Sequence, residues 1–205
     1  MKVAITGGSG FLGRMLTRSL LDRGRLVDRH GSLSAIDELV VLDQQAGEPY
    51  SDRRVRPVIG SVCDEECVED LISDEVDSVF HLAAVVSGEA EADFDKGMAV
   101  NLNGTLNVLE ACRRLNHVPR VVFTSSVAAY GSELPSPVRD DTATTPQSSY
   151  GTQKVIGELL VNDYSRKGFV DGRALRYPTV VVRPGKPNKA ASTFASSIIR
   201  EPLQG

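Results

Sequence analysis

The sequence predicts an α/β fold built on a doubly wound parallel sheet. Short runs of β-branched residues alternate with longer stretches of helical periodicity, which is the pattern of strands joined by crossover helices. These β-branched runs are continuous, as expected of strands in a parallel sheet that is covered on both faces. The 205 residues, 41% of them hydrophobic, suffice for one domain with a sizeable core.

The amino-terminal elements follow the order strand, turn and helix. A strand is expected at residues 2–6 and a helix at residues 11–23, with a glycine-rich turn between them. Gly24 directly follows this helix, and glycine is the usual residue at a helix C-terminus. The next strand pattern, ELVVLD, begins only at residue 38, so residues 25–37 are expected to form an insertion.

The alternation continues over the rest of the chain. Further strands are expected at residues 38–43, 55–59, 78–82, 120–124 and 172–177, and further helices at residues 65–72, 101–115 and 149–167. Residues 132–147 contain three prolines and several serines and threonines, which is typical of a surface loop. We expect this loop to lie near the functional site, and the sheet to be covered by helices on both faces.

Composition and charge exclude several classes of protein. The formal net charge is −4, and there is no basic stripe for nucleic acid or basic cluster for an anionic membrane. No apolar run approaches the length of a bilayer span, and the first residues form the expected strand rather than a signal peptide. Three cysteines fit a reducing compartment, and Cys63 and Cys67 lack further zinc ligands nearby. We therefore expect a cytoplasmic protein with no metal, nucleic-acid or membrane partner.

A glycine motif links the first strand to the first helix, with the spacing G-x-x-G-x-x-G. Small residues let the backbone turn tightly and approach a pyrophosphate, and the helix N-terminus offers free N–H groups and a partial positive charge. An ordinary glycine-rich turn is the alternative, but the position between a strand and an amphipathic helix favours a dinucleotide site of the Rossmann type. The cofactor contacts expected here are Gly7, Gly10, Phe11, Leu12 and Gly13.

Asp43 ends the strand expected at residues 38–43. A carboxylate at this position accepts hydrogen bonds from the adenosine ribose and repels a 2′-phosphate, so NAD is favoured over NADP as the cofactor. The usual separation from the glycine motif is about 20 residues, and the insertion at residues 25–37 accounts for the larger one here. An ordinary loop aspartate is the alternative interpretation.

Tyr150 and Lys154 open the helix that follows the proline-containing loop. Four residues apart, they share one helix face and are separated by about 6 Å along the axis. A free tyrosine is a poor base at neutral pH because its pKa is about 10. A neighbouring ammonium and a nicotinamide cation would together lower that pKa and favour the phenolate. For Y-x-x-x-K by itself, a surface pair is the alternative.

Ser126 supports the catalytic interpretation of that pair. It follows the strand at residues 120–124, and residues at the carboxyl ends of parallel strands face the ligand crevice. Its hydroxyl is placed to hold a substrate hydroxyl or carbonyl for Tyr150, and Ser125 is either a substitute for it or a turn residue. The glycine motif, the strand-end aspartate, this serine and the Tyr–Lys pair appear in the order expected of one site.

On these residues the chain resembles the extended short-chain dehydrogenase/reductase family, also described as the NAD-dependent epimerase/dehydratase family, over essentially all of its length. The resemblance implies that Tyr150 is the general base, that Lys154 anchors the ribose and modifies the pKa of the base, and that Ser126 orients the substrate. It also implies exchange of a hydride between a substrate carbon and NAD. A homodimer through the helices expected at residues 101–115 and 149–167 is a further implication.

The resemblance implies additional cofactor contacts. His81-Leu-Ala-Ala84 looks like the family's strand-end segment beside the cofactor, and Asn101 matches its structural and active-site asparagine. Ser61 stands where the family usually has an aspartate beside adenine, and Pro178 is expected near nicotinamide, with a simple strand-to-loop transition as the alternative. Together these contacts are Ser61, Val62, Leu82, Ala83, Ala84, Asn101 and Pro178.

The segment PTVVVRPGKPN at residues 178–188 resembles the branch of the family that oxidises a small sugar acid, D-erythronate, at C2. Arg183 in this segment suits a carboxylate because a guanidinium offers a fork of donors, and a solvated or acid-paired arginine is the alternative. Ser87, which follows the strand at residues 78–82, is a further expected substrate contact beside Ser126.

We expect an NAD-binding Rossmann domain over residues 1–185 and the start of a truncated substrate-binding region over residues 186–205. The first functional hypothesis is NAD-dependent oxidation of a small sugar acid. The second is an NAD-dependent nucleoside-diphosphate-sugar epimerase or dehydratase, which oxidises its substrate only transiently. The third is a non-catalytic NAD-binding module, which the intact Ser–Tyr–Lys set argues against.

Overall fold

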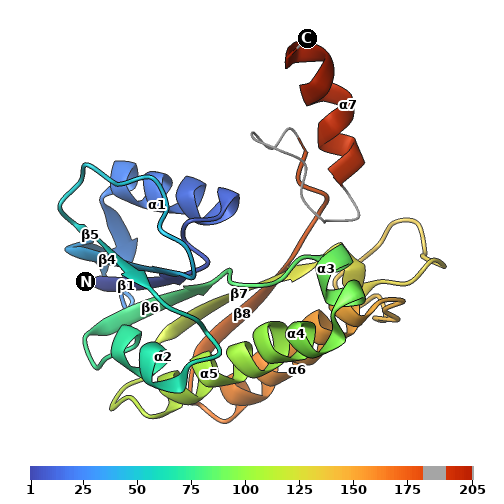
Figure 1. Ribbon diagram of the computed structural model, residues 1–205. Helices are drawn as coiled ribbons and strands as arrows, with labels where there is room; N and C mark the ends of the chain where they lie inside the picture. The colour runs from blue at the N-terminus through green and yellow to red at the C-terminus, as the bar shows by residue number, and fades with distance from the viewer. Residues whose placement is uncertain (182–192, 205) are drawn as a thin grey trace.

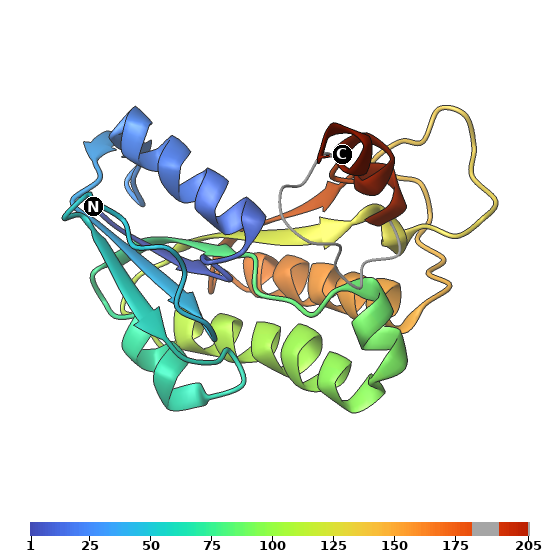
Figure 2. The ribbon, with the colours of Figure 1, turned by 45° about the horizontal axis from the view of Figure 1, so that its top comes forward.

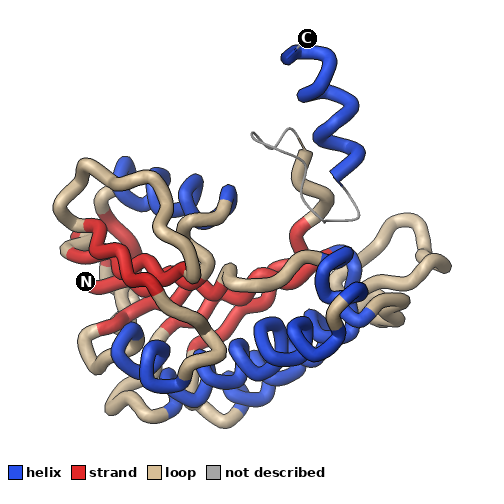
Figure 3. The backbone as a smooth tube through the Cα atoms, viewed as in Figure 1, coloured by secondary structure: helices blue, strands red, loops and turns tan. Residues whose placement is uncertain are grey.

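The computed structural model describes residues 1–181 and 193–204 and contains a six-stranded parallel sheet (Figure 1). The strand order is β5-β4-β1-β6-β7-β8. The chain adds β4 and β5 on one side of β1 and then β6, β7 and β8 on the other. Figure 3 shows the strands as one continuous twisted layer. The strands are β1 (Lys2–Thr6), β4 (Glu38–Asp43), β5 (Val55–Ile59), β6 (Val76–His81), β7 (Arg120–Ser126) and β8 (Asp171–Tyr177). The predicted doubly wound α/β fold is confirmed.

Helices pack on both faces of this sheet, as Figure 2 shows. One face carries α1 (Phe11–Arg23), and the other carries α2 (Glu65–Leu71), α5 (Gly104–Arg113) and α6 (Ser149–Arg166). Successive side chains of β1 point to opposite faces of the sheet. Ile5 packs in the cluster that contains Leu20 of α1, and Ala4 in the cluster that contains Val108 of α5 and Val161 of α6. This double burial explains why the strand is apolar without alternation.

The edge strand β8 is covered on one face only by the described part of the chain. Ala174 packs against the core under α6, and Arg176 pairs with Glu158 of that helix. The intervening Leu175 and Tyr177 are 47% and 37% exposed. The expectation that helices cover both faces is therefore correct at the centre of the sheet but not at β8.

The insertion expected at residues 25–37 contains a small antiparallel hairpin of β2 (Arg25–Val27) and β3 (Leu33–Ala35). The carboxylate of Asp28 accepts hydrogen bonds from the backbone N–H groups of His30 and Ser32, at 2.9 and 3.0 Å, and so holds the turn. The hairpin pairs outside the main sheet. It therefore delays the start of β4 without changing the place of that strand beside β1.

The helix expected at residues 101–115 begins earlier in the structure and is irregular. Two short helices, α3 (Ser87–Ala92) and α4 (Phe94–Gly97), lead into a π-helical segment, Met98–Asn103, which continues as α5. A π-helical turn accommodates an extra residue and is frequent at functional sites. Here it contains Asn101.

Two strand ends and one helix also differ from expectation. β6 ends at His81, and β7 continues to Ser126, so this serine is the last residue of its strand rather than a residue after it. The helix α7 (Thr193–Gln204) was not predicted. None of the described helices combines the length and hydrophobicity needed to cross a bilayer.

Candidate active site

The glycine turn after β1 is packed too closely for side chains. Gly7 has a φ of +72°, a backbone conformation that favours glycine, and a Cβ at Gly13 would overlap the carbonyl oxygen of Gly7. Gly10 is the N-cap of α1 and provides no side-chain cap. The N–H groups of the first helical turn, which begins at Phe11, therefore have no intrahelical acceptor and are suited to binding an anion.

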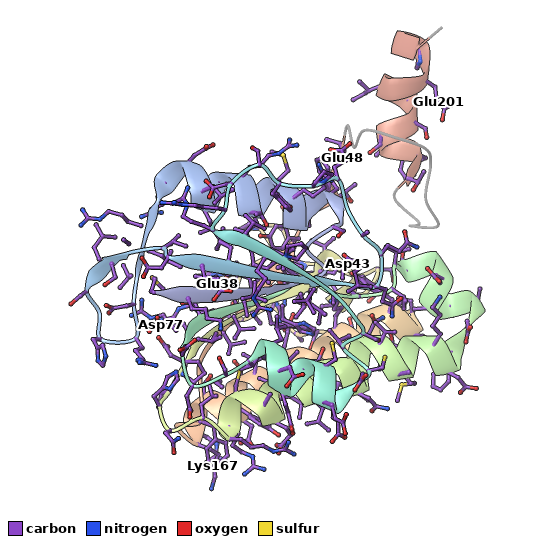
Figure 4. All side chains as sticks on the ribbon, turned by 60° about the vertical axis from the view of Figure 1, so that its left-hand side comes forward. Glu38, Asp43, Glu48, Asp77, Lys167 and Glu201 are labelled. Atoms are coloured by element: carbon purple, nitrogen blue, oxygen red, sulfur yellow. The ribbon has the colours of Figure 1, made fainter. Side chains whose placement is uncertain are left out.

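Asp43 lies at the carboxyl end of β4, the opposite end of the strand from Glu38 (Figure 4). One carboxylate oxygen of Asp43 accepts a hydrogen bond from the N–H of Ser9 at 2.9 Å, and the other accepts one from the N–H of Gln45 at 3.2 Å. These bonds fix the carboxylate relative to the glycine turn. Each oxygen retains capacity for a further donor.

A cavity of about 120 Å³ joins the glycine turn to Asp43. The residues predicted from the sequence that line it are Gly7, Asp43, Val62, Ala83 and Ala84. Gly60, which precedes the predicted Ser61 and Val62, also lines it, and the lining residues that were not predicted are Leu42, Gln44, Val85 and Val100. Ser61 lies beside the cavity, between two lining residues, and its hydroxyl accepts a hydrogen bond from the Gln44 amide at 3.1 Å.

The residues around this cavity fit the adenosine end of NAD. The Asp43 carboxylate offers acceptors for ribose hydroxyls, and the side-chain-free turn at Gly7 lets a pyrophosphate approach the first turn of α1. Ser61 is uncharged and is paired with Gln44, so the adenine would meet a neutral wall at the position where a carboxylate is usual.

A second cavity of about 770 Å³ lies at the carboxyl ends of β6, β7 and β8. Ala84 and Val85 line both cavities, so the two share one wall. The predicted site residues that line the larger cavity are Leu12, Leu82, Ala84, Ser87, Ser126, Tyr150, Lys154 and Pro178. The structure thus places the expected catalytic residues next to the expected cofactor contacts.

Lys154 is buried at the floor of the larger cavity and is only 2% exposed. Its Nζ lies 5.6 Å from the centre of the Tyr150 ring and 4.7 Å from that of Phe123. Within the described part of the chain, no acceptor forms a hydrogen bond with this ammonium. Burial lowers the pKa of Lys154 to about 8.

Tyr150 occupies the first turn of α6, where the Ser148 hydroxyl caps the helix by accepting the N–H of Gly151 at 3.1 Å. Burial raises the pKa of Tyr150 above its usual value, and hydrogen bonding with Ser126 partly opposes this. The lowering expected from Lys154 and a nicotinamide cation together would have to overcome this effect of burial. A bound nicotinamide cation would add positive charge beside Tyr150 and favour the phenolate.

The two adjacent serines at the end of β7 make different contacts. The Ser125 hydroxyl donates a hydrogen bond to the Glu158 carboxylate, within the protein core. The Ser126 oxygen accepts the N–H of Ala128 at 3.1 Å, which leaves its proton available for donation. This difference favours Ser126 over Ser125 as the hydroxyl offered to a ligand, and both line the cavity.

An ion-pair network that the sequence reasoning missed supports this end of the sheet. Glu158 of α6, one turn beyond Lys154, pairs with Arg176 of β8 at 2.7 Å. Arg176 also donates a hydrogen bond to the Tyr130 hydroxyl at 2.7 Å. With Ser125, the network connects β7, β8 and α6, and no local sequence pattern marks a pairing between residues so far apart.

Asn101 acts on the site through the backbone of Val85. Its Oδ1 accepts the N–H of Val85 at 2.8 Å, and its Nδ2 donates to the Val85 carbonyl oxygen at 3.2 Å and to Oε1 of Gln153 at 2.8 Å. Within the described residues, Asn101 lines neither cavity. It holds in place a residue that lines both.

His81 links the end of β6 to the strand and helix beside it. The Thr105 hydroxyl donates to the carbonyl oxygen of Asn101 at 2.7 Å, so its oxygen accepts the Nε2–H of His81 at 3.0 Å. The other ring nitrogen of His81 then accepts the Thr6 hydroxyl at 2.7 Å. Burial lowers the pKa of His81 to about 3, so the ring is neutral and serves as a fixed support. Arg183, the remaining predicted site residue, lies outside the described residues.

Residues 3–205 match the family described as the NAD dependent epimerase/dehydratase family. Among curated proteins, the chain is 60% identical over 205 residues to D-erythronate dehydrogenase of Cupriavidus necator, and 50% identical over 206 residues to D-erythronate dehydrogenase of Haemophilus influenzae. In both comparisons all of this chain is covered, but only 63% of the relative.

The fold is also similar to that of a solved structure. A nucleoside-diphosphate-sugar epimerase from Agrobacterium tumefaciens superposes with a TM-score of 0.87 at 45% sequence identity, over 100% of this chain and 60% of that one. The matching region thus includes both cavities and every described residue around them.

Proposed function

The chain belongs to the NAD-dependent epimerase/dehydratase family, and on that premise we propose that it provides the cofactor-binding and catalytic part of a dehydrogenase. The proposed reaction oxidises the C2 hydroxyl of a small sugar acid, D-erythronate, to a ketone. The observation that carries this proposal is that Ser126, Tyr150 and Lys154 line one cavity, whose wall at Ala84 and Val85 continues to the glycine turn. The 60% identity to a D-erythronate dehydrogenase supports the choice of substrate.

Bound NAD⁺ would supply the acceptor for the hydrogen on C2 together with its electron pair. Tyr150, as a phenolate, removes the proton from the C2 hydroxyl, and Ser126 orients that hydroxyl through a hydrogen bond. Lys154, as an ammonium, stabilises the phenolate and holds the cofactor ribose. The reaction balances as the 2-hydroxy acid and NAD⁺ giving the 2-oxo acid, NADH and one proton.

We propose that residues 1–185 form the cofactor-binding domain and that residues 186–205 begin the substrate-binding region. The chain spans 63% of the length of the curated relatives it matches. Ser87, which lines the larger cavity, and Arg183 are proposed substrate contacts. The guanidinium of Arg183 would bind the substrate carboxylate through two parallel hydrogen bonds.

A nucleoside-diphosphate-sugar epimerase is the second candidate, and the 45% identical Agrobacterium structure of that name favours it. An epimerase would use Ser126, Tyr150 and Lys154 to oxidise its substrate and then reduce it again, so NADH would not accumulate. A non-catalytic NAD-binding module would give these three side chains no role in the larger cavity.

The experiment that separates these functions mixes the complete gene product with NAD⁺ and D-erythronate and follows NADH absorbance. L-Threonate, D-threonate and UDP-sugars are assayed in parallel. Sustained NADH formation with D-erythronate is expected, and it should be abolished by Tyr150→Phe. Isomerised UDP-sugar without NADH from any acid would instead identify an epimerase.

We also propose that the protein forms a homodimer through α5 and α6, which lie side by side on one face of the molecule (Figure 1). Leu106 of α5 and Leu159 of α6 are 37% and 62% exposed there, so this face offers apolar surface to a second copy. Light scattering should give twice the mass of the chain. A monomeric mass at micromolar concentration would contradict the proposal.

A further inference from the structure

The larger cavity is electrically asymmetric. Among the described residues that line it, only Lys154 and Glu91 carry a charge. Lys154 is buried at the floor, beneath the Tyr150 ring, whereas Glu91 belongs to α3 and is exposed to solvent. A ligand in this cavity therefore meets a cation at its reacting end and an anion at the α3 wall.

Glu91 is fixed relative to the catalytic helix. One of its carboxylate oxygens accepts the backbone N–H of Ser149 at 2.9 Å, and Ser149 is the residue immediately before Tyr150. α3 packs directly against α6. An ionised carboxylate has about four acceptor positions, so this single bond leaves most of the acceptor capacity of Glu91 for a ligand.

Uncharged polar side chains also line the cavity on this side. Ser87, at the start of α3, and Gln147 and Ser148, just before α6, line the same cavity. The Gln147 amide nitrogen donates to the carbonyl oxygen of Thr145 at 3.3 Å, which leaves the side-chain carbonyl oxygen without a donor in this contact. The Glu91 carboxylate, which accepts and cannot donate when ionised, thus lies beside groups that can also hydrogen-bond to hydroxyl groups of a ligand.

We propose that Glu91 is a specificity-determining residue that accepts hydrogen bonds from the C3 and C4 hydroxyls of the sugar acid. This inference rests on the proposed oxidation at C2. When C2 is placed at Tyr150 and Ser126, its two carbon substituents, the carboxylate and the hydroxylated C3, extend in different directions. Like-charge repulsion disfavours the carboxylate at Glu91, whereas a hydroxyl there forms a charge-assisted hydrogen bond.

The orientation has a consequence for the reaction. If the substrate bound with its carboxylate and C3 in exchanged positions, the hydrogen on C2 would face away from the cofactor. Glu91 therefore selects both for hydroxylated acids and for one direction of binding. Short 2-hydroxy acids that lack hydroxyls on C3 and C4 gain nothing from it.

The test uses Glu91→Gln in the complete gene product, because the glutamine carbonyl oxygen still accepts the N–H of Ser149 while the charge is removed. The matched control is Glu89→Gln on the same helix, since Glu89 pairs with Lys96 at 2.6 Å on the surface and does not line the cavity. Each variant is assayed for kcat and KM with D-erythronate and with its 3,4-dideoxy analogue, 2-hydroxybutanoate of the same configuration at C2. Thermal unfolding and the Kd for NAD are measured beside them.

Glu91→Gln is expected to lower kcat/KM for D-erythronate about tenfold or more, the usual size for loss of a hydrogen bond to a charged group. For the dideoxy analogue it should change kcat/KM less than about twofold. Glu89→Gln should leave both substrates unaffected. Equal losses with both acids would overturn the inference, because Glu91 would then act only on the start of α6, and unchanged kinetics with both would overturn it as well. If the unaltered protein forms no NADH from either acid, the proposed function itself fails and the inference falls with it.

Discussion

The ammonium of Lys154 lies 5.6 Å from the centre of the Tyr150 ring, one helical turn further along α6. Burial acts on both groups in the direction of their neutral forms. It raises the pKa of Tyr150 and lowers that of Lys154 to about 8. A bound nicotinamide cation would add positive charge beside the pair and favour the phenolate of Tyr150.

The buried ammonium of Lys154 should reduce the stability of the ligand-free protein. The pKa of Lys154 is about 8 in the folded protein, whereas its ordinary value, which applies to the unfolded chain, is 10.5. Between pH 8 and pH 10.5 the unfolded chain therefore binds more protons than the folded protein. The loss of folding stability caused by the buried ammonium is present in full below pH 8 and decreases as the pH rises toward 10.5. At pH 7 it is on the order of 3 kcal/mol.

Lys154→Met should accordingly raise the midpoint of thermal unfolding by several degrees at pH 7. The difference between variant and unaltered protein should narrow steadily above pH 8. Calorimetry at a series of pH values checks this. A difference that is constant with pH would show that Lys154 has the same pKa in the folded and unfolded states, and would contradict the prediction.

Asp43→Asn should weaken NAD binding about tenfold, because a neutral amide replaces the charged acceptor for the ribose hydroxyls. The preference for NAD over NADP should decrease at the same time, since the repulsion of a 2′-phosphate is removed. Fluorescence titration with both cofactors measures the two Kd values. Glu38→Gln, at the opposite end of the same strand, is the control and should leave both unchanged.

Gly13→Ala should lower the free energy of unfolding and abolish NAD binding, because the new methyl group would overlap the carbonyl oxygen of Gly7. Overpacking of this kind costs about 1–3 kcal/mol. The comparison is Gly31→Ala in the β2–β3 hairpin. An added methyl group there has no atom beyond its chain neighbours within 4 Å, so only the positive φ of +84° is unfavourable. If Gly13→Ala binds NAD normally, the close-packed turn is not required for the cofactor.

Glu158→Gln should destabilise the protein by about 3 kcal/mol or more, because it leaves the Arg176 guanidinium partly buried without its counter-ion. Denaturant unfolding measures the effect. Asp163→Asn on the same helix removes an exposed pair with Arg166 and should change stability by no more than about 0.5 kcal/mol. Similar small effects of both substitutions would contradict a structural role for the Glu158–Arg176 pair.

The sequence was most informative where local patterns decide structure. The strand β1, the glycine turn and α1 are adjacent in the chain, and the left-handed Gly24, with a φ of +66°, ends that helix as predicted. Tyr150 and Lys154 are one turn apart on the same helix face, so their proximity also follows from spacing alone.

Features that depend on contacts between distant segments could not be predicted in this way. Arg176 and Glu158 meet only because β8 and α6 pack together, and the π-helical segment around Asn101 has no distinct periodicity in the sequence. The rise in the pKa of Tyr150 likewise arises from burial by several elements, which the Y-x-x-x-K motif does not encode.

Oxidation at C2 is tested most directly by following the hydrogen on C2 of the substrate. The complete gene product is incubated with NAD⁺ and D-erythronate that carries deuterium at C2, and the reduced cofactor is analysed by mass spectrometry. Hydride transfer from C2 predicts one deuterium in each NADH formed, and a catalytic Tyr150 predicts no reaction when it is replaced by phenylalanine. NADH without deuterium would contradict oxidation at C2, and reduced cofactor at the normal rate from the Tyr150→Phe variant would contradict the role of the tyrosine.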